Sequence, residues 1–260
     1  MRLGIGTYTF MWSIGIEGAR PAAPMTARAL AEKARELHVG LVQYGPNLPV
    51  TLEDLAPARD MGLEIEIGVA GLAIRESVRF ARAAGASLLR TVLPYEAAEA
   101  PPASEIEQGL RALVPVLEAE DMRLGLENSV TPAATLKAVL ESVGSSSVGI
   151  TLDTANSIVI GESWRHVLEA LAPHVVCLHL KDYTIRREWH RMGFRLTGAP
   201  AGKGAVDVPY LLNSLQAAGA RFNTVLELWP PEQAALDETI ALEHAWARES
   251  VAYLRTLITE

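Results

Sequence analysis

The segment VVCLHLKDY, residues 175–183, is an apolar run with a histidine near its middle and a charged end. Side chains alternate along a β-strand, so Val176, Leu178 and Leu180 share one face and His179 lies on the other. In a closed barrel the outer face of each strand packs against helices and is the apolar face. We therefore expect the three apolar residues to face outward and His179 to point into a barrel.

Seven further β-rich runs alternate with helical patterns along the 260 residues of the chain. These runs span residues 3–10, 41–45, 63–71, 88–94, 123–129, 148–156 and 223–230. Apolar residues at helical spacing predict helices at 25–38, 105–120 and about 232–258. Strand followed by helix, repeated eight times, predicts a parallel sheet closed into a (β/α)₈ TIM barrel. Because no linker or shift of composition interrupts residues 1–260, we expect a single α/β domain.

Composition excludes several classes of protein. Cys177 is the single cysteine, so no intrachain disulfide is possible, and we expect a reducing, cytoplasmic location. The net charge of −8 argues against a nucleic-acid partner. No window reaches the roughly 18 apolar residues of a membrane span, and the N-terminal residues lack the regions of a signal peptide. The expected partner is a small molecule rather than a nucleic acid or a membrane.

Three other predicted strands each place one acidic side chain on the inward face, namely Glu127, Asp153 and Glu227. Three carboxylates that converge in a low-dielectric interior repel one another strongly, and a divalent cation removes this repulsion. Oxygen ligands combined with the imidazole of His179 suit Mn²⁺, Mg²⁺, Co²⁺ or Zn²⁺. Each residue alone could have a structural role, but four equivalent positions on consecutive strands favour a metal site.

Two basic residues near these positions each have two interpretations. Lys181, inward and two residues beyond His179, could bind a substrate carboxylate or carbonyl and transfer a proton, or it could neutralise surplus ligand charge. Arg90 could form a structural ion pair with Glu66 on the neighbouring strand, or it could reach an anionic substrate. Both interpretations stay open for each residue.

The stretch 184–206 is predicted to be a long irregular loop above the carboxyl ends of the strands, where barrel enzymes bind substrates. Its basic residues include Arg186, Arg187 and His190, which could hold a carboxylate or a phosphate or could simply be solvated. Further candidates for the lining of the substrate pocket are two aromatic side chains and one amide: Trp12, Trp229 and Gln43.

The motifs LENS, LDTAN, HLKD and LELW, in this order on the last four predicted strands, resemble those of the xylose isomerase-like barrel superfamily. That superfamily contains sugar isomerases and epimerases, inosose dehydratases, hydroxypyruvate isomerases and AP endonucleases. The resemblance implies that Glu127, Asp153, His179 and Glu227 bind one divalent metal ion, which we expect to be Mn²⁺, with Mg²⁺, Co²⁺ or Zn²⁺ as alternatives. It also implies a homodimer or a homotetramer.

The chain departs from the pattern of the ketose epimerases at two places. Asn156 stands where those enzymes typically carry a substrate-contacting histidine, and alanines follow LEN where they carry a glutamate. AP endonucleases need several more histidine ligands than this chain offers on its early strands. The two departures count against a free-ketose 3-epimerase of that type and leave Asn156 as a candidate substrate contact. The missing histidines count against a DNA-repair function.

The resemblance and the residues together predict an isomerase or epimerase of a small sugar, keto-sugar or sugar phosphate that acts through a metal-stabilised enediolate. Glu127 or Glu227 would remove the proton, with Lys181 as a further catalytic residue. The alternative is a decarboxylase of a 3-oxo sugar acid, with Lys181 and the arginine-rich loop near the carboxylate. Dehydration of a keto-polyol is a third version. A non-catalytic metal- or sugar-binding protein is the alternative from a different class.

Overall fold

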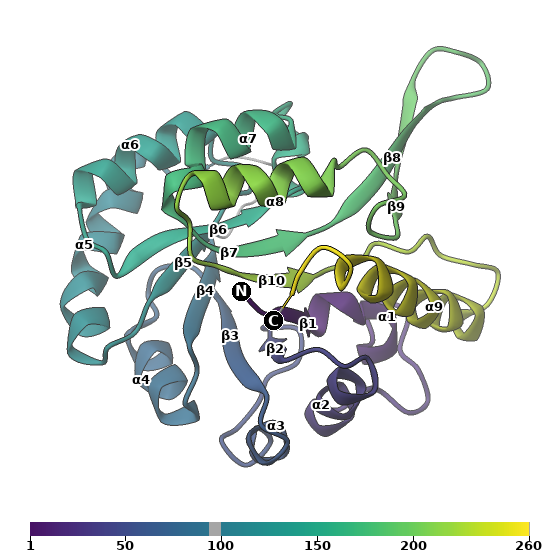
Figure 1. Cartoon of the computed structure of the whole chain (residues 1–260), viewed down its shortest axis with the longest axis horizontal. Helices are drawn as coiled ribbons and strands as arrows, with labels where there is room; N and C mark the ends of the chain where they lie inside the picture. Colours follow the sequence, from purple (N-terminus) through teal and green to yellow (C-terminus); the bar gives the residue numbers. More distant parts are fainter. Residues whose placement is uncertain (94–99, 260) are drawn as a thin grey trace.

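The structure, a computed structural model, describes residues 1–93 and 100–259. Pro94, the last residue of the predicted strand 88–94, and Glu260 lie outside the described residues. Eight parallel strands close into a barrel in the order β1-β10-β7-β6-β5-β4-β3-β2, and helices surround it (Figure 1). The predicted α/β TIM barrel is therefore confirmed.

The barrel strands are shorter than most of the predicted runs. Their bounds are β1 Leu3–Gly6, β2 Leu41–Tyr44, β3 Glu64–Ala70, β4 Leu88–Val92, β5 Leu124–Glu127, β6 Val148–Asp153, β7 Val175–Leu180 and β10 Asn223–Leu226. The run 3–10, for example, leaves the sheet after Gly6 and turns into the 3₁₀ helix Thr7–Thr9. The polar ends of these runs therefore lie in the loops at the carboxyl ends of the strands.

The helices are amphipathic and pack their apolar faces on the barrel. They are α1 Met11–Ile14, α2 Ala27–Glu36, α3 Ala56–Asp60, α4 Arg75–Ala84, α5 Ala103–Ala119, α6 Ala133–Val143, α7 Trp164–Leu171, α8 Val208–Ala217 and α9 Leu236–Leu254. The large apolar core includes Leu178 and Leu180 of β7 together with residues of these helices, so both leucines face outward as predicted. Across the described ranges, no helix is both long and apolar enough to cross a membrane.

Val176 does not face the helices, and this part of the prediction is wrong. Val176 and Cys177 both belong to a small apolar cluster inside the barrel. The pairing of β6 with β7 shifts register between Ile150 and Thr151, which leaves Val176 as an extra residue on β7. Glycine makes room for it, because a Cβ on Gly149 would lie 2.3 Å from Val176 Cγ1. The bulge restores the expected alternation from Leu178 onward.

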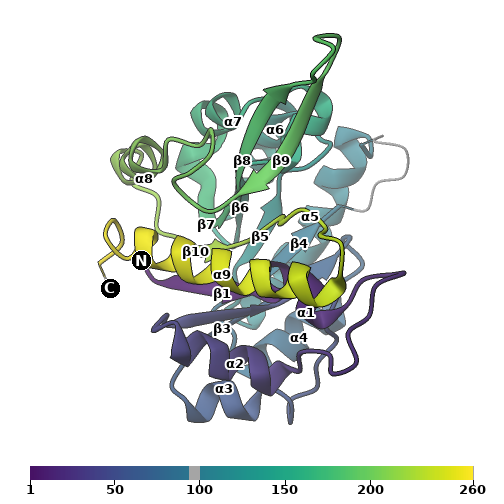
Figure 2. The ribbon, with the colours of Figure 1, turned by 90° about the vertical axis from the view of Figure 1, so that its right-hand side faces the viewer.

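The stretch 184–206 is not the irregular loop that the sequence predicted. Strands β8 (Asp182–Arg187) and β9 (Phe194–Ala199) form an antiparallel hairpin that extends β7. The hairpin projects beyond the ring of helices in both views (Figures 1 and 2). Its base is fixed by Asp182, whose carboxylate accepts hydrogen bonds from the backbone N–H groups of Gly202, Gly204 and Val206.

Candidate metal centre

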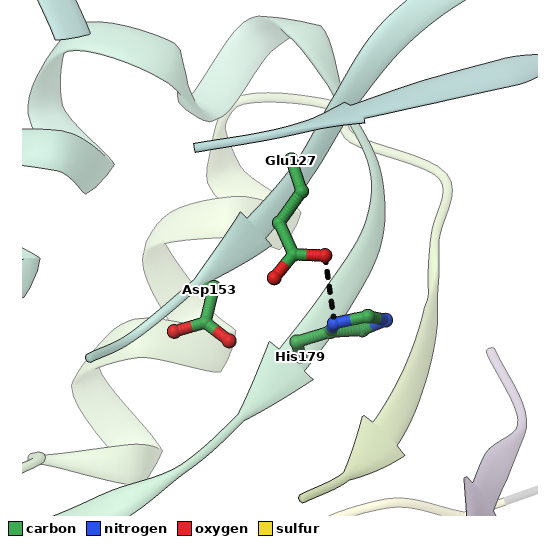
Figure 3. Close-up of side chains that lie close together, drawn as sticks. All are labelled: Glu127, Asp153 and His179. Atoms are coloured by element: carbon green, nitrogen blue, oxygen red, sulfur yellow. Dashed lines mark ion pairs between the residues drawn. The ribbon is translucent and has the colours of Figure 1, made fainter. Parts of the chain in front are cut away.

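Glu127, Asp153 and His179 lie at the carboxyl ends of the adjacent strands β5, β6 and β7 (Figure 3). One possible ligand atom from each residue lies within 4.8 Å of those from the other two, and all three side chains are buried. Figure 3 shows the Glu127 carboxylate turned toward the His179 ring, with Asp153 beside them. The period-2 alternation of the strands therefore brings these predicted residues together.

Glu227 lies beside this group, on the strand that pairs with β7 from the other side. It follows β10 directly, and its backbone N–H donates to the carbonyl of Leu180, which continues the sheet by one residue. Its Oε1 lies 3.0 Å from His179 Nδ1, and Glu127 Oε2 lies 3.4 Å from the same nitrogen. Two glutamates therefore flank one imidazole in the interior of the barrel.

Two buried cations neutralise part of this acidic cluster. Lys181 Nζ lies 2.8 Å from Asp153 Oδ2 and 2.7 Å from Glu227 Oε2. Arg90 contacts the carboxylate of Glu127 through its Nε. The predicted pairing of Arg90 with Glu66 is wrong. Glu66 lies opposite Leu88, so Arg90 stands two residues nearer the carboxyl end of the barrel, where it meets Glu127. Both cations lie beside expected metal ligands.

The donor atoms of the cluster fit a cation. Among the described residues, Glu127 Oε2, both ring nitrogens of His179 and both carboxylate oxygens of Glu227 are buried and have no aligned hydrogen bond. These atoms contact Arg90, Lys181 or one another, but none of them forms an aligned hydrogen bond, whereas buried polar atoms normally do. Their lone pairs are therefore available to a cation once His179 has lost its proton. Oxygen and imidazole ligands of this number are typical of a site for a divalent ion.

The electrostatics of the cluster follow from its burial and its charges. Burial works to lower the pKa of His179, but the carboxylates of Glu227 and Glu127 outweigh burial and raise that pKa well above its usual value. Burial alone would raise the pKa of Glu127, but the guanidinium of Arg90 and the imidazole of His179 lower it to about 2. Both glutamates therefore stay ionised, since the pKa of Glu227 is lowered as well.

Asn128, which the sequence analysis did not single out, holds the metal-facing end of β6. Its Oδ1 accepts a hydrogen bond of 2.7 Å from the backbone N–H of Asp153, and its Nδ2 donates to the carbonyl of Asp153 at 2.9 Å. The Asp153 Oδ1 atom in turn accepts from the backbone N–H groups of Ala155 and Asn156. Asn128 follows the expected ligand Glu127 directly in the motif LENS, and this was the signal that could have identified it. It was overlooked because strand alternation places its side chain on the outward face.

Asn156 lies beside the cluster rather than in a distant loop. Its Nδ2 donates to Glu127 Oε1 at 2.7 Å, and its Oδ1 accepts from Lys181 Nζ at 3.2 Å. Tyr8 lies against Arg90, whose Cζ is 5.6 Å from the centre of the tyrosine ring. A substrate above the cluster would meet an amide and a phenol as well as charges.

The predicted lining residues occupy different depths. Lys181 Nζ lies 5.0 Å from the ring centre of Trp229, which is partly exposed and borders the site. The indole N–H of Trp12 donates to the carbonyl of Pro230, so Trp12 anchors the segment that carries Trp229. Gln43 lies inside the barrel, where its amide donates to Glu66, and it does not belong to the same group of contacts.

The predicted anion-binding residues of the 184–206 stretch are placed on the projecting hairpin. Arg186, Arg187 and His190 are all exposed there, and Arg187 donates to the carbonyl of Arg191. Contacts of these three residues with a substrate remain a prediction. The buried cations at the cluster are instead Arg90 and Lys181.

Comparisons with known proteins agree with this fold. The family model described as xylose isomerase-like TIM barrel matches residues 12–257. The chain belongs to the xylose isomerase-like TIM barrel family. A 3-oxo-isoapionate decarboxylase from Pectobacterium atrosepticum is 32% identical over 98% of this chain and 96% of its own length.

Solved structures of the xylose isomerase-like family share the fold of the whole chain. D-psicose 3-epimerase with D-tagatose from Clostridium cellulolyticum superposes with a TM-score of 0.72 at 13% identity and covers 98% of this chain and 99% of its own. A xylose isomerase-like protein from Mycobacterium smegmatis in complex with magnesium has a TM-score of 0.68 at 15% identity, with 97% of each chain covered. Proteins that share this fold therefore include an epimerase and a protein solved with magnesium.

Proposed function

We propose that this protein is a divalent-metal-dependent decarboxylase that acts on a 3-oxo sugar acid. The observation that carries the proposal is the pairing of both glutamates with buried cations, Arg90 with Glu127 and Lys181 with Glu227. An isomerase needs one of these glutamates as a free base, whereas a decarboxylase needs no base for its first step. The relative named a 3-oxo-isoapionate decarboxylase, matched over nearly the full length, supports the same reaction class.

The charge of the cluster suits an anionic substrate. Glu127, Asp153 and Glu227 would hold the ion together with His179, and Arg90 and Lys181 add two fixed positive charges. Three carboxylates against these two cations and a divalent ion leave one net positive charge when His179 is neutral. A carboxylate-bearing substrate would balance that charge, but a neutral ketose would not.

The identity of the ion is part of the proposal. Oxygen donors with one imidazole favour Mn²⁺, with Mg²⁺, Co²⁺ or Zn²⁺ as alternatives. When bound, such an ion would supply Lewis-acid stabilisation of the negative charge that develops on the carbonyl oxygen of the substrate.

The residues of the chain supply the remaining steps. Arg90 and Lys181 are placed to orient the substrate carboxylate by charge-assisted hydrogen bonds. The bond between this carboxylate and the carbon beside the carbonyl breaks, its electron pair stays on that carbon, and CO₂ leaves. The carbon then takes a proton, for which Lys181 Nζ is a buried donor already positioned at the cluster. Trp229 and Tyr8 would limit the access of water.

A sugar isomerase or epimerase is the second candidate. It is favoured by the position of Glu127 and Glu227 on either side of His179, at 3.4 and 3.0 Å from its Nδ1, since two carboxylates facing one substrate could exchange a proton. In that reaction the ion pairs with Arg90 and Lys181 would have to open on substrate binding.

Mass spectrometry of products formed in D₂O separates the two reactions. The Mn²⁺-loaded protein would be incubated with 3-oxo sugar acids, ketoses and ketose phosphates, with EDTA as a control. We expect a product that has lost CO₂ and gained one deuterium on carbon. An isomeric product carrying solvent deuterium, formed from a ketose with no loss of CO₂, would replace the proposal by the epimerase.

A further inference from the structure

Two adjoining clefts open on the face of the barrel opposite the candidate metal centre. Their volumes are about 420 and about 480 Å³, and Arg123, Val176, Ala220 and Arg221 line both. These residues lie at or before the amino ends of the strands, whereas the expected metal ligands lie at the carboxyl ends. The length of β6 separates the two faces by roughly 16 Å. The clefts are therefore distinct from the candidate metal centre.

The larger cleft is lined from the segments that precede four neighbouring strands. The barrel order β10-β7-β6-β5 brings together Arg221 before β10, His174 before β7, Ser146 before β6 and Arg123 before β5. Each of these four side chains can donate hydrogen bonds. None of the described residues that line this cleft is acidic. The lining therefore suits an anion.

The two arginines of the larger cleft have free guanidinium groups. Within the described part of the chain, neither side chain forms an ion pair, a hydrogen bond or a ring contact, and both are exposed. An arginine elsewhere on the surface, by contrast, is paired, since Arg111 lies 2.8 Å from Glu107. Two like charges that border one cleft repel each other, and an anion shared between them relieves this repulsion.

The carboxylates near the two clefts are already engaged with other residues. Glu64, in the smaller cleft, pairs with Arg2 at 2.8 Å, and Glu66 accepts hydrogen bonds from two side-chain amides. Glu118, beside the larger cleft, accepts from the hydroxyl of Ser145 at 3.3 Å. None of these acids neutralises the two free arginines. An anion would consequently be held in the larger cleft, away from Glu64 and Glu66.

We infer that the larger cleft binds a small organic dianion, with Arg123 and Arg221 on its charged oxygens and with Ser146 and His174 as further donors. The planar guanidinium group presents paired N–H donors that match the oxygens of a phosphate or a carboxylate. A volume of about 480 Å³ exceeds what inorganic phosphate fills, so the ligand carries an organic part, as in a sugar phosphate or a dicarboxylic acid. The net charge of −8 repels anions, so the local pair of arginines provides the attraction.

Isothermal titration calorimetry of the metal-loaded protein, in about 0.15 M NaCl, tests this inference with glucose 6-phosphate and succinate as the two dianions. We expect a dissociation constant below about 1 mM for at least one of them. The double substitution Arg123→Ala with Arg221→Ala raises that constant by at least about 10-fold. The matched control is Arg82→Ala on α4, which removes an exposed arginine outside both clefts and leaves the constant unchanged. Circular dichroism shows that each variant is folded.

A further variant separates this site from the candidate metal centre, which also carries buried cations. Arg90→Met leaves binding at the cleft unchanged, because Arg90 contacts Glu127 at the opposite face. If the wild type binds two equivalents, the double substitution removes one of them. The dianion that binds more tightly identifies the ligand as a phosphate ester or a dicarboxylate.

Two results overturn the inference. A wild type that binds neither dianion below about 1 mM leaves the arginines as ordinary solvated side chains. Binding that survives the double substitution unchanged places the dianion elsewhere, and its loss in Arg90→Met would assign it to the metal centre. Because no activity is measured, either result leaves the proposed decarboxylase reaction to its own test.

Discussion

The guanidinium of Arg90 contacts the carboxylate of Glu127 inside the barrel, and both side chains are almost fully buried. Arg90 lies on β4 opposite Gly125 of β5, two residues before Glu127, so its side chain extends toward the carboxyl end of the barrel to reach the glutamate. Because of this ion pair, the Glu127 carboxylate is not free to act as a base. Arg90 also adds a positive charge at the candidate metal centre.

Replacing Arg90 tests the role of the cation in the proposed reaction. Arg90→Met is expected to lower kcat/KM for a 3-oxo sugar acid by at least about 100-fold, because the substrate loses a charge-assisted contact and Glu127 loses its partner. Steady-state kinetics measure the change, with Arg90→Lys as the variant that keeps the charge and should recover part of the rate. Full activity of the methionine variant would remove Arg90 from the mechanism.

Metal content distinguishes the expected ligands from other buried acids. Glu227→Gln and His179→Asn are expected to lose most of the bound metal when the purified proteins are analysed by elemental mass spectrometry. Glu66→Gln is the matched control, since Glu66 is buried in the same barrel but is hydrogen-bonded to Gln43 and Asn223. Equal metal content in all three variants would contradict the assignment.

Metal binding should release protons and strengthen as the pH rises. The carboxylates of Glu127 and Glu227 raise the pKa of His179 well above its usual value, so the metal-free imidazole holds a proton at neutral pH. A metal ligand must be deprotonated, so each increase in pH below that pKa favours binding. Isothermal titration calorimetry in buffers of different ionisation enthalpy counts the released protons. Binding that is independent of pH would show that His179 is not a ligand.

Glu243 of α9 links the C-terminal helix to α1, the short helix that carries Trp12. Its carboxylate accepts from the backbone N–H groups of Trp12 and Ser13 and from the Ser13 hydroxyl at 2.6 Å. Burial raises the pKa of Glu243 to about 7. The folded state therefore binds this proton more tightly than the unfolded state does.

The free energy of unfolding should consequently fall as the pH rises from about 4.5 to about 7, by up to about 3 kcal/mol from this group. Glu243→Gln removes the titration, so the difference between variant and wild type isolates the contribution of Glu243. Urea titrations at several pH values measure it. Identical pH profiles for the two proteins would refute the assignment.

The bulge at Val176 requires a glycine beside it. A Cβ on Gly149 would lie 2.3 Å from Val176 Cγ1 and 2.7 Å from the carbonyl oxygen of His174. Gly149→Ala is therefore expected to lower the free energy of unfolding by about 1–3 kcal/mol or more. The control is Gly193→Ala, just before β9 in the hairpin, where the nearest atom to a new Cβ is 3.8 Å away. Equal stability of both variants, measured by urea unfolding, would show that β7 can shift to relieve the contact.

The alternation of side chains along single strands was sufficient to predict the barrel and the inward direction of its polar groups. This periodicity is local, so Glu127, Asp153, His179 and Glu227 could each be assigned to the interior from a few neighbouring residues. The spacing of strand and helix patterns likewise determined the fold class. The prediction of the metal ion rests on the same reasoning, since converging carboxylates need a cation.

The tertiary structure alone decided which partners these groups have. Arg90 reaches Glu127 rather than Glu66 because the register of β3, β4 and β5 and the length of the side chain set their relative heights in the barrel. The inward turn of Val176 depends on a shift between two strands that are paired across the sheet, and no pattern within β7 reveals it. The hairpin after β7 forms for a similar reason, since its hydrogen bonds join residues on both sides of a turn. Contacts between distant parts of a chain depend on register and closure, which a local period does not contain.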